Sequence, residues 1–104
     1  MEVFYANVRV SNFAKKIDKQ FESRFERGLR LLREYGYQLG SPQSKALGGG
    51  LFELRIIGMI HFRFIYAFHN GSIFILHAFQ KKSERIPDRE MAYARQQLKS
   101  IADI

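Results

Sequence analysis

The sequence predicts an α+β fold with a short N-terminal strand, a helical segment, a three-strand antiparallel meander and a C-terminal helix. Three features of the chain indicate this class. Apolar residues recur every three or four positions between Val10 and Tyr35, as one face of a helix requires. Residues 51–79 form short runs with strand periodicity, and Pro87 then opens a second helical pattern. The length of 104 residues fits one domain that spans residues 1–104.

The N-terminal part is expected to contain a strand and then helix. Residues 1–5 or 1–6 are rich in Val, Phe and Tyr, which favour strands. Ser11 or Asn12 can cap the start of the helical segment, and Asp18 can cap a second helix. The segment is therefore either one long helix or a helical hairpin that breaks near residues 17–19. The apolar stripe consists of Val10, Phe13, Ile17, Phe21, Phe25, Gly28, Leu32 and Tyr35.

Glycines separate this helical segment from the predicted meander. Residues 36–50 contain five of them, together with Ser41-Pro42, and predict a loop. The three expected strands cover residues 51–57, 60–68 and 72–79. Asn70-Gly71 is the signal of a tight hairpin turn between the last two. The strand at 72–79 is apolar on both faces, as in a central strand or one covered on both sides.

The last helix is expected to begin at Pro87, with acidic residues in its first turn. Its buried stripe comprises Met91, Ala94, Leu98 and Ile101. We expect all the helices to lie on one face of the sheet, so that the opposite face stays partly open.

The composition narrows the classes of function. With 17 Lys and Arg against 10 Asp and Glu, the formal net charge is +7, which favours polyanionic partners. A merely basic, soluble surface is the alternative. The absence of Cys excludes disulfide scaffolds and thiol nucleophiles, and it fits the cytoplasm. The uncharged run at residues 64–80 is broken by Asn70-Gly71, so no membrane span is predicted there. The first five residues show no basic segment followed by an apolar stretch, so no secretory signal is predicted either.

Charged residues in the middle of two predicted strands are the most informative feature. Arg55 and Arg63 belong to one face of the meander, together with His61. If the apolar faces of the two strands are kept together, the two guanidinium groups lie close to each other. Like charges repel at that range unless an anion lies between them, and the anion could be Glu53 or a nucleic-acid phosphate. A surface ion pair of Arg55 with Glu53 is the structural alternative.

A basic cluster with Lys81, Lys82 and Arg85 follows the last strand and precedes the start of the helix. Cleavage of RNA by its own 2′-hydroxyl requires a base, cations that stabilise the developing phosphorane charge, and an acid for the leaving oxygen. Arg suits the second role by its forked geometry, while Lys or His can serve the proton transfers. These residue types therefore favour RNA cleavage.

Four stretches of the chain resemble one known family when they are taken together. They are Lys45–Arg55 (KALGGGLFELR), Phe62–Tyr66 (FRFIY), His77–Lys82 (HAFQKK) and Ile86–Glu90 (IPDRE). From Lys45 onwards the chain resembles the HigB-like branch of the RelE/ParE toxin superfamily, with its phage-associated relatives. Residues 1–40 agree in element order, which implies that the helical segment is a two-helix hairpin of the RelE-like fold.

The resemblance implies the toxin of a type II toxin-antitoxin system, in many members a ribosome-dependent mRNA endonuclease that uses no metal and no cofactor. Its expected partners are a helix-turn-helix antitoxin, the ribosome and mRNA. Two other functions stay open: a ParE-like toxin that acts on gyrase without catalysis, and a non-toxic relative that only binds its antitoxin.

The expected site residues follow partly from the motifs. Arg55, Arg63, Lys81 and Lys82 match the family pattern as catalytic residues, and His61 is the nearest candidate for the general base. The residues expected to contact RNA phosphates are Lys45, Arg27 and Arg85. His77 is predicted to be a core histidine, and the histidines lack the Cys and Asp neighbours of a metal site.

Overall fold

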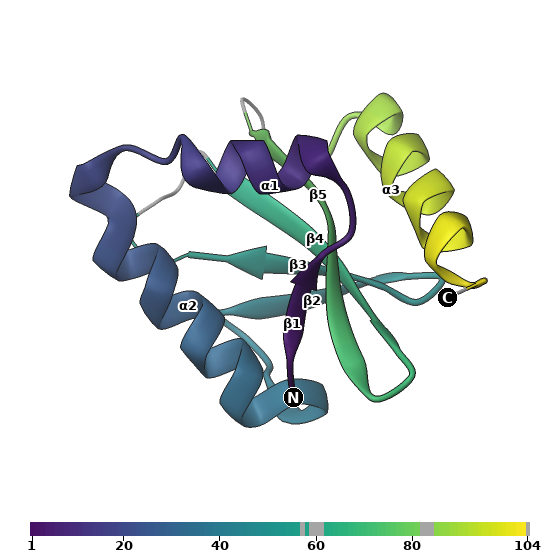
Figure 1. Cartoon of the computed structure of the whole chain (residues 1–104), viewed down its shortest axis with the longest axis horizontal. Coiled ribbons are helices and arrows are strands. Elements are labelled where there is room, and N and C mark those ends of the chain that lie inside the picture. The colour runs from purple at the N-terminus through teal and green to yellow at the C-terminus, as the bar shows by residue number, and fades with distance from the viewer. Residues whose placement is uncertain (57, 59–61, 82–84, 104) are drawn as a thin grey trace.

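The computed structural model describes residues 1–56, 58, 62–81 and 85–103. In this part of the chain, five strands form one sheet in the order β1-β5-β4-β3-β2 (Figure 1). The strands are β1 (Val3–Tyr5), β2 (Ser44–Gly48), β3 (Leu51–Arg55), β4 (Phe62–His69) and β5 (Ser72–Gln80). The strand β1 runs parallel to β5, and the other neighbours pair antiparallel.

Three α-helices complete the described fold, which confirms the α+β class. They are α1 (Val8–Lys15), α2 (Glu22–Tyr35) and α3 (Asp88–Ile101), and single 3-10 turns occupy Lys19–Phe21 and Gly36–Gln38. The helical segment is therefore a hairpin and not one long helix. No helix among the described residues has both the length and the apolar character that crossing a membrane requires.

The predicted cap of the first helix is one turn too late. Asn7, and neither Ser11 nor Asn12, caps α1, because its side chain accepts a hydrogen bond from the Val10 backbone N–H at 2.8 Å. Asp18 does cap the following element, where its side chain accepts from the backbone of Gln20 at the start of the 3-10 turn. The chain thus leaves β1 and enters α1 within two residues.

The prediction of a three-strand meander is also incomplete, because the meander contains a fourth strand. The segment Ser44–Gly48 was expected to be loop, but it forms β2 at the sheet edge, antiparallel to β3. The glycines after it form the tight connection, with positive φ at Gly48, Gly49 and Gly50. The predicted ends of the first two meander strands at residues 57, 60 and 61 lie outside the described residues.

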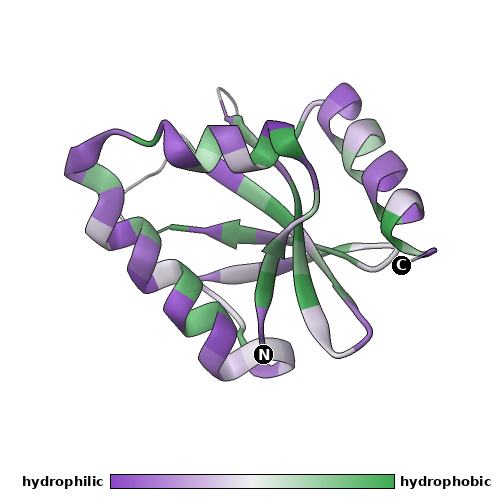
Figure 2. Ribbon diagram, viewed as in Figure 1, coloured by the Kyte–Doolittle hydropathy of each residue, from purple (hydrophilic) through white to green (hydrophobic). Residues whose placement is uncertain are grey.

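The helices lie on both faces of the sheet, so the expectation of a single helical face is wrong. Helices α1 and α2 cover one face around Leu54, Phe64 and Ile75. The helix α3 packs on the other face, where a second apolar cluster lies. That cluster has the buried members Leu51, Ile65, Ala67, Leu76, Phe79, Ala94 and Ile101. Since strands β4 and β5 are apolar on both sides, both sides need a cover. Figure 2 shows hydrophilic and hydrophobic residues alternating along the helices, as expected when one side of a helix packs on a sheet.

A β-bulge in β5 is the point where β5, α1 and α3 are linked by hydrogen bonds. Ile65 pairs with His77 and Tyr66 pairs with Ile75, so Leu76 is an extra residue in β5. The Leu76 carbonyl accepts a hydrogen bond from Asn7 Nδ2 at 3.0 Å, and the same Nδ2 donates to Gln97 Oε1 on α3 at 2.8 Å. The Asn7 side chain therefore caps α1, bonds to the carbonyl of the bulged residue and links both to α3.

We expect Asn7→Ala to lower the free energy of unfolding by about 1–3 kcal/mol, because it removes a helix cap and leaves a partly buried carbonyl without its donor. Asn7→Ser keeps an oxygen for the cap but loses the amide donor, so its loss should be intermediate. The exposed Asn12 within α1 is the control, and Asn12→Ala should change stability by less than about 0.5 kcal/mol. Denaturant unfolding measures all three, and equal stabilities of the two alanine variants would contradict this account.

Candidate active site

The two arginines face each other across neighbouring strands, but near the strand ends and not in mid-strand as predicted, because Arg55 is the last residue of β3 and Arg63 the second of β4. Arg55 in β3 stands directly opposite Arg63 in β4, so both side chains lie on the same face of the sheet, as predicted. This is the face on which α3 packs, because Leu51 of β3 and Ile65 of β4 share its apolar cluster. The strands thereby place two cations on the sheet face that α3 covers, beside its apolar cluster.

A buried carboxylate holds the two guanidinium groups. Arg55 Nε and Arg63 Nε donate to the same atom, Glu53 Oε1, at 2.8 Å and 3.0 Å. The Glu53 side chain is 2% exposed, against 35% for Arg55 and 14% for Arg63. Of the anions considered from the sequence, the carboxylate is the one observed between the arginines. The pair of Arg55 with Glu53 is accordingly not a surface ion pair, since its acidic member is buried.

This arrangement is one that a buried charge requires. A carboxylate out of water is costly unless cations and hydrogen bonds compensate it, and charge-assisted bonds are the strongest available. Arg63 is fixed further by a bond from Nη1 to the Phe62 carbonyl at 2.8 Å. The guanidinium groups are thus held by strands and not by loops.

Two lysines extend this cationic group. Lys45 in β2 stands opposite Glu53, and Lys81 directly follows β5. Burial lowers the pKa of Lys81 from its ordinary value of 10.5; Glu53 opposes this shift, whereas Arg63, Arg55 and Lys45 add to it. A lowered pKa leaves more of the neutral amine at a given pH, and the neutral amine is the form that can accept a proton.

A depression of about 240 Å³ lies beside these residues. It brings together three predicted site residues, Lys45, Lys81 and Arg85. Arg85 is the least fixed of them, because its side chain is 81% exposed and pairs with Asp88 at 3.0 Å. The described lining consists of Lys45, Leu47, Glu53, Lys81, Arg85, Ile86 and Met91. Such a surface can bind an anion, stabilise charge that develops on it and exchange a proton with it.

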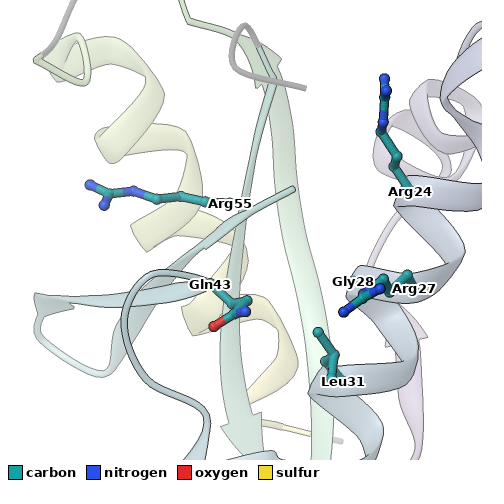
Figure 3. Close-up of a pocket in the computed structure, with 6 residues that line it drawn as sticks. All are labelled: Arg24, Arg27, Gly28, Leu31, Gln43 and Arg55. Carbon is teal, nitrogen blue, oxygen red and sulfur yellow. The ribbon is translucent and has the colours of Figure 1, made fainter. Parts of the chain in front are cut away.

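Arg27 is not part of this cluster. It projects from α2 and lines a different cleft, of about 470 Å³, between that helix and the sheet (Figure 3). The described lining of this cleft is Arg24, Arg27, Gly28, Leu31, Gln43 and Arg55. Arg55 thus lines this cleft, while its side chain bonds to Glu53, which lines the depression. The remaining predicted residues, His61 and Lys82, lie outside the described residues.

The sequence interpretation missed three contributors to these surfaces. Glu53 was considered as a possible ion-pair partner, but not as the buried anchor of both arginines. Its polar-face position in β3 was the available signal. Arg24 and Gln43 were not singled out, because the contact between α2 and the residue before β2 is tertiary and has no sequence pattern.

His77 is a core residue, as predicted. It is 1% exposed, its Nε2 lies 3.0 Å from Glu90 Oε2, and its ring packs on Tyr93 of α3. Burial lowers the pKa of His77, while Glu90 opposes that shift. Within the described residues, no group of three or more His, Asp and Glu side chains is placed to hold a metal ion.

Comparison with known proteins assigns the family. The model of the family described as phage-derived protein Gp49-like (DUF891) matches residues 12–99. No curated protein matches the chain. The matched range includes α2, the four-strand meander and most of α3, and it contains every described residue of the cationic cluster. The chain therefore belongs to the phage-derived Gp49-like family, a family of RelE-like toxins of toxin-antitoxin systems, whose members have an antitoxin partner.

Proposed function

We propose that this chain is a toxin of the HigB-like branch that cleaves mRNA on the ribosome. In this proposal it acts in the cytoplasm, and a helix-turn-helix antitoxin silences it. The observation that carries the proposal is the pair of guanidinium groups that Glu53 Oε1 holds on one face of the sheet, beside Lys81. A protein that only bound its antitoxin would need no lysine of lowered pKa next to two fixed arginines.

The proposed reaction is an attack of the RNA on itself. The 2′-oxygen forms a bond to the adjacent phosphorus, and the 2′-hydroxyl proton passes to the neutral Nζ of Lys81. Arg55 and Arg63 stabilise the charge that builds on the phosphorane oxygens. The bond from phosphorus to the 5′-oxygen then breaks, and that oxygen takes up a proton. The products are a 2′,3′-cyclic phosphate and a 5′-hydroxyl end.

The other residues have supporting roles in this scheme. Glu53 is a positioning residue, because it touches the arginines and not the substrate. Lys45 and Arg85 contact flanking phosphates from the walls of the depression. His61 and Lys82 are the candidates for the acid that protonates the leaving oxygen. In this scheme Lys81 accepts the proton of the 2′-hydroxyl, His61 or Lys82 supplies the proton of the leaving oxygen, and the two arginines stabilise the phosphorane charge.

Induced expression followed by mapping of mRNA 5′ ends tests the proposal directly. We expect new 5′-hydroxyl ends within translated regions, and their disappearance when Arg63 is replaced by Ala. Arrest of growth with intact mRNA, together with a loss of gyrase supercoiling activity in the presence of the purified protein, would instead identify a gyrase-directed toxin.

Arg63→Ala should lower the rate of cleavage at saturating ribosome concentration by about a hundredfold or more, with ribosome affinity nearly unchanged, because the lost contact acts on transition-state charge. Arg63→Lys should recover only part of the rate, since a lysine lacks the fork of donors. Arg95, which is exposed on α3, provides the control variant Arg95→Ala. Thermal melting confirms that each variant is folded. A fully active, folded Arg63→Ala protein would refute the assignment.

The dependence of the rate on pH tests the role of Lys81. If its neutral amine is the base, the rate should rise with pH, with a midpoint below the ordinary lysine value of 10.5. Because Glu53 raises the pKa of Lys81, Glu53→Gln should move this midpoint to lower pH and also lower the maximal rate, as both arginines lose their anchor. Lys81→Arg should abolish the rise. A rate that falls with pH through the same range would make Lys81 an acid and contradict this role.

A further inference from the structure

The cleft between α2 and the sheet differs from the proposed active site in composition. Arg24 and Arg27 form its helical wall, and Gln43 and Arg55 lie on the sheet side (Figure 3). None of its described lining residues is acidic. Among the described residues, neither Arg24 nor Arg27 forms an ion pair, although both are exposed.

The two acidic residues in the first half of α2 lie away from the cleft. Glu22 and Glu26 line a groove against Tyr5 and α1, whereas Arg24 and Arg27 line the cleft. The carboxylates of the same helix therefore do not neutralise the cleft arginines by direct contact. The guanidinium groups of Arg24 and Arg27 on the helical wall repel each other, and an anion in the hollow would relieve that repulsion.

Two glycines allow close approaches at and beside the helical wall of the cleft. At Gly28 an added Cβ would collide with Cδ1 of the buried Ile56, so a larger residue here would require that side chain to shift. At Gly58, where φ is +89°, an added Cβ would lie 2.8 Å from Cδ and Nε of Arg24. The Arg24 stem thus lies across Gly58, and its Cζ is 5.9 Å from the centre of the Phe21 ring.

Arg55 connects the cleft with the cationic cluster. Its Nε is bound to Glu53, its backbone N–H donates to the Gln43 carbonyl at 2.7 Å, and the residue is part of the cleft lining. In Figure 3 this side chain extends away from the α2 residues, toward the face that carries α3. A chain of phosphates that lies on Arg55 can continue from one hollow into the other.

We infer that this cleft is a second RNA site, which binds backbone phosphate of the same strand that the cationic cluster cleaves. The inference rests on the proposed function for the identity of that strand. Recognition here is independent of sequence, because Arg24 and Arg27 offer charge and donors for phosphate and the described lining offers no aromatic surface for a base. Arg24 and Arg27 position the strand and take no part in bond breaking.

Binding of a short 2′-O-methyl RNA, which cannot be cleaved, tests the inference apart from catalysis. We compare Arg24→Gln/Arg27→Gln with Arg30→Gln/Arg33→Gln, which removes the same charge from the same helix at residues that do not line the cleft. Glutamine keeps the side-chain stem, and thermal melting confirms folding. Fluorescence anisotropy against salt should give a slope that is smaller by about 1.4 for the cleft variant, since each lost contact to single-stranded phosphate contributes about 0.7. The slope of the control variant should change by less than half of that.

The outcomes separate this inference from the proposed function. Equal slopes for the two double variants, with a wild-type protein that cleaves mRNA, would overturn the cleft site and leave the function standing. A reduced slope only for the cleft variant, with a wild-type protein that does not cleave, would support the site and refute the function. Unchanged RNA binding with weaker binding to empty ribosomes would assign the cleft to ribosomal RNA and overturn the single-strand inference.

Discussion

One oxygen atom, Glu53 Oε1, fixes both the site and the sheet around it. A carboxylate buried to this degree is tolerated only with cations at hydrogen-bonding distance, and Arg55 and Arg63 supply them from adjacent strands. A slip of β3 against β4 by one residue would turn one of these arginines toward the apolar layer under α1 and α2. The register of β3 against β4 therefore determines how far apart the two guanidinium groups lie.

The bulge at Leu76 is the second constraint, and it concerns α3. The extra residue directs Leu76 and His77 to the α3 side, where one enters the apolar cluster and the other contacts Glu90. The helix α3, which packs on these residues, contributes Met91 to the depression near Lys81. The helix α3 thus forms one side of the depression through an uncharged residue, while the charged lining residues come from other parts of the chain.

Much of the fold is predictable from the sequence, because the alternation in residues 51–79 and the helical stripe are strong local signals. The shared face of Arg55 and Arg63 follows from the same alternation. The strand Ser44–Gly48 is not predictable in this way, since it is short, ends in glycines and gains its stability from pairing with β3. The location of α3 was misjudged although the double-sided apolar character of residues 72–79 already required a second cover. Burial of Glu53 could not be foreseen, because a pattern gives the face of a strand but not what covers that face.

The anchoring of the cations on strands has a consequence for how activity can be lost. Arg55 is the last residue of β3 and Arg63 the second of β4, and both are bonded to a carboxylate inside β3, so strand pairing and ion pairs hold them together. Their geometry is lost when β3 and β4 separate at this end of the sheet. Under the proposed function, substitutions that weaken the core reduce the number of folded, competent molecules without slowing each one. Such substitutions therefore change the amount of folded protein and not the rate constant of each folded molecule.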